Sequence, residues 1–220
     1  MSESRVLRLF RFRPVNKGFD AVLREDLVPD LLAFPAVVDV YVGRQGPDEM
    51  GERLVASVWE SRSEMAAAVG EDFDPPSFHA EHLDETADRV LEIHELDVAM
   101  RFEDAPPGVA PAAGILRLVR GQVRPGELPP YRDEVRRGTI ADVEAGHGPL
   151  ALYLAIEPPD RFVTMSLWSS WSALEAATGG DVRRPIATRH EERILGWEAV
   201  HYEVLPNARE AVRAVSEPRR

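Results

Sequence analysis

Two matched sets of polar and aromatic residues recur along this chain, and their types are suited to acid–base chemistry on a small molecule. Histidine and tyrosine exchange protons usefully when a site of low polarity shifts their pKa. Aromatic walls with a few convergent polar groups are typical of small-molecule pockets. The candidate catalytic residues are His94, His201, Tyr41 and Tyr153, and the candidate substrate-binding residues are Arg8, Arg117, Ser57, Ser166, Trp59 and Trp168.

The two sets match because the chain repeats itself at a fixed spacing. Val6-Leu7-Arg8-Leu9 returns as Ile115-Leu116-Arg117-Leu118, and Ser57-Val58-Trp59-Glu60-Ser61 returns as Ser166-Leu167-Trp168-Ser169-Ser170. The spacing is 109 residues at both places (6 to 115, and 59 to 168). This predicts a tandem duplication of one supersecondary unit.

The elements that position these residues follow the order β-α-β-β-α-β in each copy. The predicted strands span residues 5–13, 36–43, 53–59 and 89–98, then 115–123, 149–156, 162–168 and 197–205. A helix is expected after the first strand, with Pro29 bending or ending it. A second is expected over 62–69, where Ser61 and Glu64 have capping-box spacing. The predicted fold class is α+β, with two tandem ferredoxin-like units.

Alternation along the strands predicts which face the helices cover. The second strand of each copy places Val38, Val40 and Val42, or Leu152, Leu154 and Ile156, on one apolar face. We expect helices over that face, together with Leu7, Leu9, Leu54, Ala56 and Val58 of the neighbouring strands. The mixed faces, which carry the candidate residues, are then expected to meet between the two sheets.

Composition predicts the domain boundaries and narrows the partners. Residues 1–104 are predicted as the first ferredoxin-like unit, 105–113 as a Pro- and Gly-rich linker, 114–205 as the second unit, and 206–220 as a tail. The net charge of −12 disfavours nucleic acid and anionic membranes. With no cysteine and no apolar leader or span, the chain is expected to be cytoplasmic. A small apolar or aromatic molecule is the expected partner, and a homodimer of pseudo-dimers is an open alternative.

The repeated Trp-x-Ser turn and the element order resemble the antibiotic-biosynthesis-monooxygenase branch of the dimeric α/β-barrel superfamily. The segment that carries the resemblance is Ser57-Val58-Trp59-Glu60-Ser61-Arg62-Ser63-Glu64-Met65. In that family two ferredoxin-like units set their sheets face to face. The resemblance spans 6–98 and 115–205, and implies an intramolecular pseudo-dimeric barrel.

The resemblance also bears on cofactors. Haem-degrading members have a tryptophan where this chain has Ala68 and Ala177, and a haem-ligand histidine near the positions of Phe78 and Ala187. These departures, the missing cysteines and the absence of a phosphate-binding glycine motif predict no haem, flavin, nucleotide or metal. A metal site from His79, His82 and Glu81 lacks a third strong ligand.

Each candidate residue also has a structural interpretation. The tryptophans can plug the strand ends, and the arginines can form ion pairs with Asp39, Glu92 or Glu203. The histidines can be hydrogen-bonded interior residues, and His79, His82 and His190 fit a solvated helix face.

Two function classes remain open from the sequence. The first is a cofactor-independent monooxygenase-like enzyme that acts on a small aromatic or polyketide-like substrate in the barrel between the sheets. The alternative is a non-catalytic barrel that binds or senses a small apolar ligand.

Overall fold

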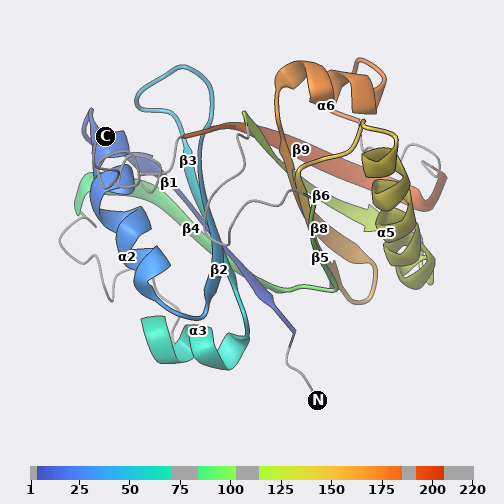
Figure 1. Ribbon diagram of the computed structural model, residues 1–220, viewed down its shortest axis with the longest axis horizontal. Coiled ribbons are helices and arrows are strands. Elements are labelled where there is room, and N and C mark those ends of the chain that lie inside the picture. Colours follow the sequence, from blue (N-terminus) through green and yellow to red (C-terminus); the bar gives the residue numbers. More distant parts are fainter. Residues whose placement is uncertain (1–3, 71–83, 103–113, 185–191, 206–220) are drawn as a thin grey trace, which may run out of the picture. The chain divides into compact units, whose positions relative to one another are not determined.

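The computed structural model describes residues 4–70, 84–102, 114–184 and 192–205. These residues form two compact units (Figure 1): unit 1 runs to Ile93 and resumes at Glu203, and unit 2 takes His94 and the residues that follow it to Tyr202. The predicted linker and tail, and the metal-site residues His79, Glu81 and His82, lie outside the described residues, as does His190.

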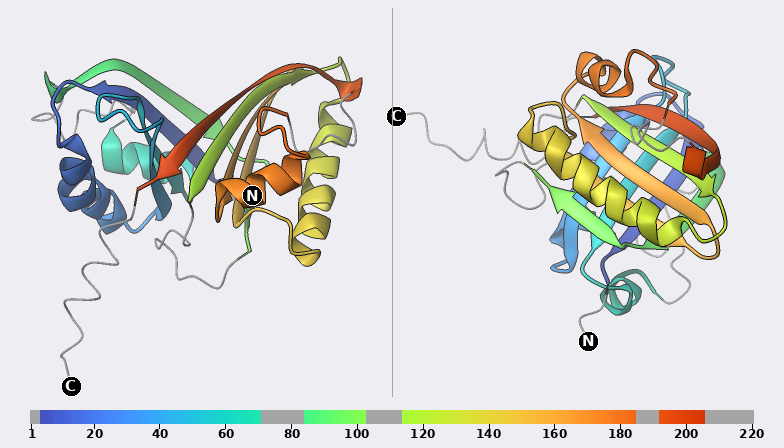
Figure 2. Two further views of the ribbon diagram at one scale, coloured as in Figure 1. Left: turned by 90° about the horizontal axis from the view of Figure 1, so that it is seen from above. Right: turned by 90° about the vertical axis from the view of Figure 1, so that its right-hand side faces the viewer.

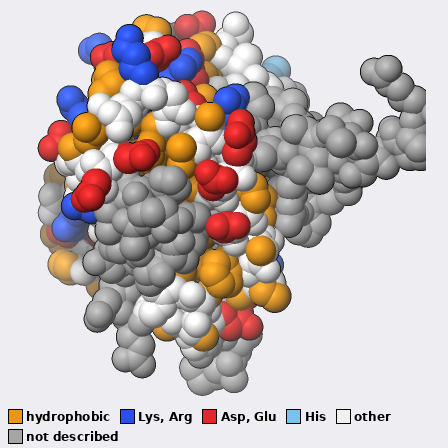
Figure 3. All heavy atoms as spheres, turned by 90° about the vertical axis from the view of Figure 1, so that its left-hand side faces the viewer, with side chains coloured by type: hydrophobic (Ala, Val, Ile, Leu, Met, Phe, Trp, Pro, Cys, Tyr) orange, Lys and Arg blue, Asp and Glu red, His pale blue; other side chains and the backbone are white. Residues whose placement is uncertain are grey.

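Unit 1 is a sheet covered by helices on one face. Its elements are β1 (Val6–Pro14), α1 (Phe19–Val22), the π-helical segment η1 (Leu23–Leu27), α2 (Val28–Ala33), β2 (Val37–Arg44), β3 (Arg53–Trp59), α3 (Arg62–Val69) and most of β4 (Thr86–Glu95). The strand β3 pairs antiparallel with β1 and β2, and β4 lies on the other edge of β1. Acidic, basic and hydrophobic side chains are interspersed on the face of unit 1 shown in Figure 3.

In unit 2, as in unit 1, helices alternate with antiparallel strands along the chain. Its elements are β5 (Val98–Arg101), β6 (Ile115–Val123), α5 (Leu128–Glu144), β7 (Ala151–Glu157), β8 (Arg161–Trp168), α6 (Trp171–Thr178) and most of β9 (Ile194–Val204). The helix α5 runs across one face of the strands (Figure 2). Because the end of β9 pairs with β2, the described strands form one nine-stranded sheet in the order β4-β1-β3-β2-β9-β6-β8-β7-β5.

The predicted strands are confirmed close to their predicted ends, with one correction. The strand expected over 89–98 is two strands, β4 and β5, and β5 pairs with β7 of unit 2. The Asp97 carboxylate accepts a hydrogen bond from the Ile156 N–H at 2.9 Å, which fastens the turn between β4 and β5 to β7. A single strand was expected because no break in the apolar pattern separates the two segments.

The predicted helices also form, and Pro29 changes one of them locally. The helix after β1 continues to Ala33, but the five residues from Leu23 to Leu27 widen into a π-helical segment. Proline has no N–H for the preceding turn, and a widened turn accommodates that loss. Helix α3 begins at Arg62 as predicted, and the Ser61 hydroxyl accepts the Glu64 N–H at 3.2 Å. Ser170 caps α6 through the Ala173 N–H in the same way.

The prediction of which strand faces lie under the helices is wrong for β1 and β3. Val6, Phe10 and Phe12 of β1 pack with α1, η1, α2 and α3. Leu7 and Leu9 point to the opposite face, which none of these described helices covers and which we call the helix-free face. In β2 the prediction for Val40 and Val42 is confirmed. The error arises because both faces of β1 and β3 are buried, so alternation alone does not identify the helix-covered one.

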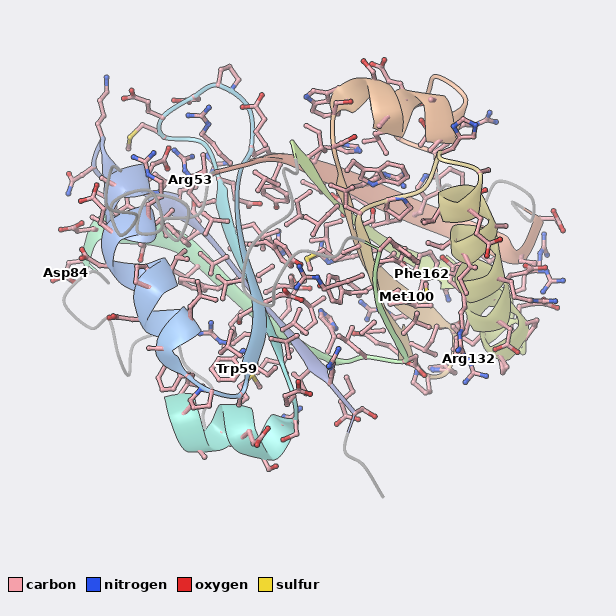
Figure 4. The ribbon with its side chains drawn as sticks, viewed as in Figure 1. Arg53, Trp59, Asp84, Met100, Arg132 and Phe162 are labelled. Carbon is pink, nitrogen blue, oxygen red and sulfur yellow. The ribbon has the colours of Figure 1, made fainter. Side chains whose placement is uncertain are left out.

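The helix-covered cores are closed by tryptophan, phenylalanine and tyrosine rings. In unit 1 Trp59 lies at the α3 end of β3 and packs with Met65 and Val69, while Arg53 lies at the other end of the same strand (Figure 4). In unit 2 the Phe162 ring packs against Tyr131 of α5, with ring centroids 4.5 Å apart and planes tilted by 37°. Gly121 of β6 leaves room for the Phe162 ring, because a Cβ at that position would overlap it and would lie 2.9 Å from the Gly196 carbonyl oxygen.

We expect Gly121→Ala to destabilise the protein by about 1–3 kcal/mol, since the added methyl overpacks the contact with Phe162. The matched change is Gly138→Ala in α5, where nothing lies within 4 Å of a new Cβ. It should stabilise by about 0.5–1 kcal/mol through higher helix propensity. Urea unfolding measures both. Equal effects of the two substitutions would contradict the packing role of Gly121.

Candidate functional site

The strand registers divide the predicted site residues between the two faces of each sheet. Arg8 pairs with Ser57, and Arg117 pairs with Ser166. These four residues, with Trp59 and Trp168, lie on the helix-covered faces. His201 lies on the same side of unit 2, because Ala199, two residues earlier, packs against its core and the His201 ring contacts Trp171 of α6. Tyr41 pairs with Ala56, and Tyr153 pairs with Met165, on the helix-free faces. The prediction that each set of five shares one face is therefore wrong.

Each tryptophan is tied to a serine two residues earlier. The Trp59 indole N–H donates to Ser57 Oγ at 2.9 Å, and the Trp168 indole N–H donates to Ser166 Oγ at 3.0 Å. Both tryptophans are fully buried. A buried indole N–H needs such a partner, so these pairs fix the rings in the core and support the structural interpretation of the tryptophans.

Arg117 is a buried cation at the centre of unit 2. It is 2% exposed, and its Nη2 donates to the carbonyl oxygens of Val182, at 3.3 Å, and Arg184. Its Nε is buried without a hydrogen-bond partner, and no carboxylate of the described residues pairs with it. Burial lowers the pKa of Arg117 to about 10, with Tyr131 opposing the shift, so the guanidinium stays charged at neutral pH.

His201 lies beside Arg117 and is held in its neutral form. Burial is the main cause that lowers its pKa below 6.5, the Arg117 charge lowers it further, and an interaction with the Val182 backbone opposes both. The Nε2 atom is buried without a hydrogen-bond partner among the described residues. A neutral imidazole with an unoccupied nitrogen can accept a proton.

Tyr131 and Trp171, which the sequence prediction missed, complete this site. We call Arg117, Tyr131, Trp171 and His201 together the Arg117 cluster. The Tyr131 phenol is buried, and burial raises its pKa, with Thr164 and Arg117 opposing the rise. The Trp171 ring packs on the His201 ring, with centroids 5.4 Å apart and planes tilted by 48°. Both residues lie outside the recurring pattern that selected the candidates, so the search for matched pairs overlooked them.

His94 lies in a different environment. It is 7% exposed, and its Nδ1 lies 2.7 Å from a carboxylate oxygen of Glu157, both within unit 2. Glu157 also faces Arg161 at 3.7 Å. This arrangement favours the interior, hydrogen-bonded interpretation of His94.

Two of the carboxylates considered as partners of Arg8 and Arg117 form ion pairs with other arginines. Glu92 pairs with Arg11 at 2.8 Å, and Glu203 pairs with Arg44 at 3.3 Å. In the described part of the chain, no group of three or more histidine, aspartate or glutamate side chains is placed to hold a metal ion. None of the helices described combines the length and the apolar character needed to span a membrane.

Among known proteins, the chain is similar to others in structure and not in sequence. No protein-family model matches the chain, and no curated protein matches it in sequence. A structure named "putative monooxygenase" from Fusobacterium nucleatum has a TM-score of 0.67 at 13% identity, over 93% of this chain and 94% of that one. An anthrone oxidase-like protein has a TM-score of 0.58 at 16% identity, over 92% of each chain.

A third structure names the fold. It is a ferredoxin fold protein from Listeria monocytogenes described as related to antibiotic biosynthesis monooxygenases, with a TM-score of 0.52 at 9% identity over 93% of this chain and 96% of that one. Proteins named chlorite dismutases are also among the structural neighbours. At these identities the likeness defines the class as an α+β, ferredoxin-fold protein similar to antibiotic-biosynthesis-monooxygenase-like structures, and it does not select a reaction.

The lowered pKa of His201 predicts how stability depends on pH. The unfolded chain takes up a proton near pH 6.5, while the folded protein resists protonation to a lower pH. The free energy of unfolding should therefore fall as the pH drops from 6.5 toward the folded pKa. His201→Gln should show a smaller fall over that window, as measured by urea unfolding.

His147→Gln is the matched control, because His147 is exposed. It should keep the wild-type pH profile. If the His201 variant loses stability with falling pH as steeply as the wild type, the imidazole is not held neutral by the fold.

Proposed function

We propose that this chain is a cofactor-independent, monooxygenase-like enzyme acting on a small aromatic or polyketide-like phenol, with its chemistry at the Arg117 cluster. The observation that carries the proposal is the pairing of a neutral His201, whose Nε2 has no partner among the described residues, with the buried Arg117 charge. The proposed site lies on the helix-covered face of unit 2, where the register supports Arg117, whereas the sequence predicts the site on the helix-free faces.

The two groups have complementary roles. His201 Nε2 would remove the acidic proton of an electron-rich phenol or anthrone. Arg117 would stabilise the resulting anion, because a nearby buried cation lowers the pKa of the substrate. The anion reacts with molecular oxygen at a ring carbon. The imidazolium returns its proton to the peroxide formed there. The remaining C–H bond of that carbon and the O–O bond then break, so that one oxygen atom stays on the carbon as the quinone carbonyl and the other leaves as water with both protons. Four electrons pass from the substrate to oxygen, two of them through the new carbon–oxygen bond.

The proposal requires no redox cofactor, because the substrate anion itself supplies the electrons. The roles predicted for His94, Tyr41 and Tyr153 stay predictions. Of the four candidate catalytic residues, His201 is favoured because a cation lies beside it and because Trp171, which it contacts, is 39% exposed and so reachable from solvent.

We also propose that the chain is a tandem duplication whose helix-free faces cover each other as a pseudo-dimeric barrel. The same Trp-to-Ser hydrogen bond and the same serine cap occur in both units. The helix-free face of each unit is apolar, with Leu7, Leu9 and Val58 in one and Leu116, Leu118 and Leu167 in the other. A soluble protein rarely leaves such faces uncovered.

The test is oxygen uptake in air with a panel of anthrones and naphthols, with the enzyme first checked by absorbance and elemental analysis for haem, flavin and metal. The wild type should oxidise at least one compound, and EDTA should not change the rate. His201→Gln should reduce kcat by about 10²–10⁴-fold, the usual contribution of a positioned base. His147→Gln should retain the wild-type rate.

The pH profile adds a second readout. Because the pKa of His201 is lowered, the rate should fall only at a pH below 6.5 and should be level at pH 7–8. Uptake that survives in His201→Gln contradicts the assignment of the base. If compounds bind without reacting, the alternative of a barrel that binds or senses a small ligand takes its place.

A further inference from the structure

The charge of Arg117 lacks a counterion among the described residues. Its hydrogen bonds go to two backbone carbonyl oxygens, which neutralise only part of the charge, and its Nε has no partner. Placing a guanidinium in a site that is 2% exposed costs several kcal/mol unless a negative group compensates it. A ligand that supplies an anionic oxygen would remove that cost and occupy the unused donor.

Trp171 presents an aromatic surface next to this charge. It is the first residue of α6, and the Ser170 cap holds the turn that positions it. Its side chain is 39% exposed, unlike Trp59 and Trp168, which are fully buried. Its ring contacts His201, so an aromatic ligand stacked on Trp171 would also lie near the imidazole.

Unit 1 keeps the arginine but not its surroundings. At the 109-residue spacing Tyr131 corresponds to Val22, Thr164 to Val55 and Trp171 to Arg62. On β4 the side chains on the helix-covered face are Leu91 and Ile93, which pack against the core. The described residues of unit 1 therefore offer no imidazole and no exposed tryptophan at the matching place.

We propose that the chain holds a single ligand site, in unit 2, for a planar aromatic carboxylate. Arg117 binds the carboxylate, Trp171 stacks on the ring as a positioning residue, and His201 faces the ring substituent that reacts. This inference rests on the proposed function, whose site it shares, and adds to it the charge of the substrate and the number of sites per chain.

The experiment is calorimetric titration without oxygen, using 1-hydroxy-2-naphthoate and its neutral isostere 1-hydroxy-2-naphthamide. The carboxylate should bind with one equivalent per chain and at least about tenfold more tightly than the amide, the effect of one charge-assisted hydrogen bond. Trp171→Ala should weaken both ligands alike and leave the ratio of their affinities unchanged. Arg62→Ala, the matched change in unit 1, should alter neither affinity.

Arg117→Gln should bring the two affinities together. Because Arg117 is buried, the Arg117→Gln variant is used only if circular dichroism shows the wild-type fold. If it does not fold, the comparison of the two ligands and the Trp171→Ala variant still test the inference. Equal affinity for carboxylate and amide, two equivalents per chain, or unchanged binding in Trp171→Ala would each overturn the inference.

A final arm separates this inference from the proposed function. The same ligands are mixed with the protein in air while oxygen uptake is followed. Selective binding of the carboxylate without uptake supports the ligand class and contradicts the oxygenase. Uptake with neutral phenols, together with no preference for the carboxylate, supports the oxygenase and contradicts the ligand class.

Discussion

The antiparallel register between β6 and β8 determines which side chains of unit 2 lie under its helices. It places Arg117 opposite Ser166 on the face covered by α5 and α6, so a positive charge lies on the same face as the core residues Val119, Leu154 and Phe162. A shift of one residue would turn Arg117 to the other face and bring Leu116 or Leu118 under the helices. The indole N–H of Trp168, bonded to Ser166, helps to hold this register by filling the end of the core.

The low polarity around that charge sets the properties of the neighbouring groups. Burial keeps His201 neutral and Tyr131 protonated, and the Arg117 charge shifts both pKa values downward. The net shift lowers the pKa of His201 and raises that of Tyr131. The directions differ because burial disfavours the charged form, which is the imidazolium of His201 and the phenolate of Tyr131. The result is a neutral proton acceptor next to a cation, a combination suited to removing a proton and retaining the anion.

The two units share a framework but differ at the site. The framework consists of the Trp-to-Ser hydrogen bond, the serine cap on the following helix, and an arginine opposite the serine. At the positions that surround the arginine, unit 1 has valines where unit 2 has tyrosine and threonine. Two units with one framework can differ in this way, since one unit can keep a polar site while the other gains stability from an apolar core.

The sequence by itself determined the strands, the capped helices and the recurring residues, because alternation, helical spacing and serine caps are local signals. It also singled out Arg117 and His201, which the tertiary structure places together beside Val182. Only the tertiary structure decided that Tyr153 lies on the opposite face from Arg117, and that Tyr131 and Trp171 join the site. Both faces of the central strands are buried, so hydrophobic alternation does not identify the helix-covered one. The contacts of Tyr131 and Trp171 join residues far apart in the chain.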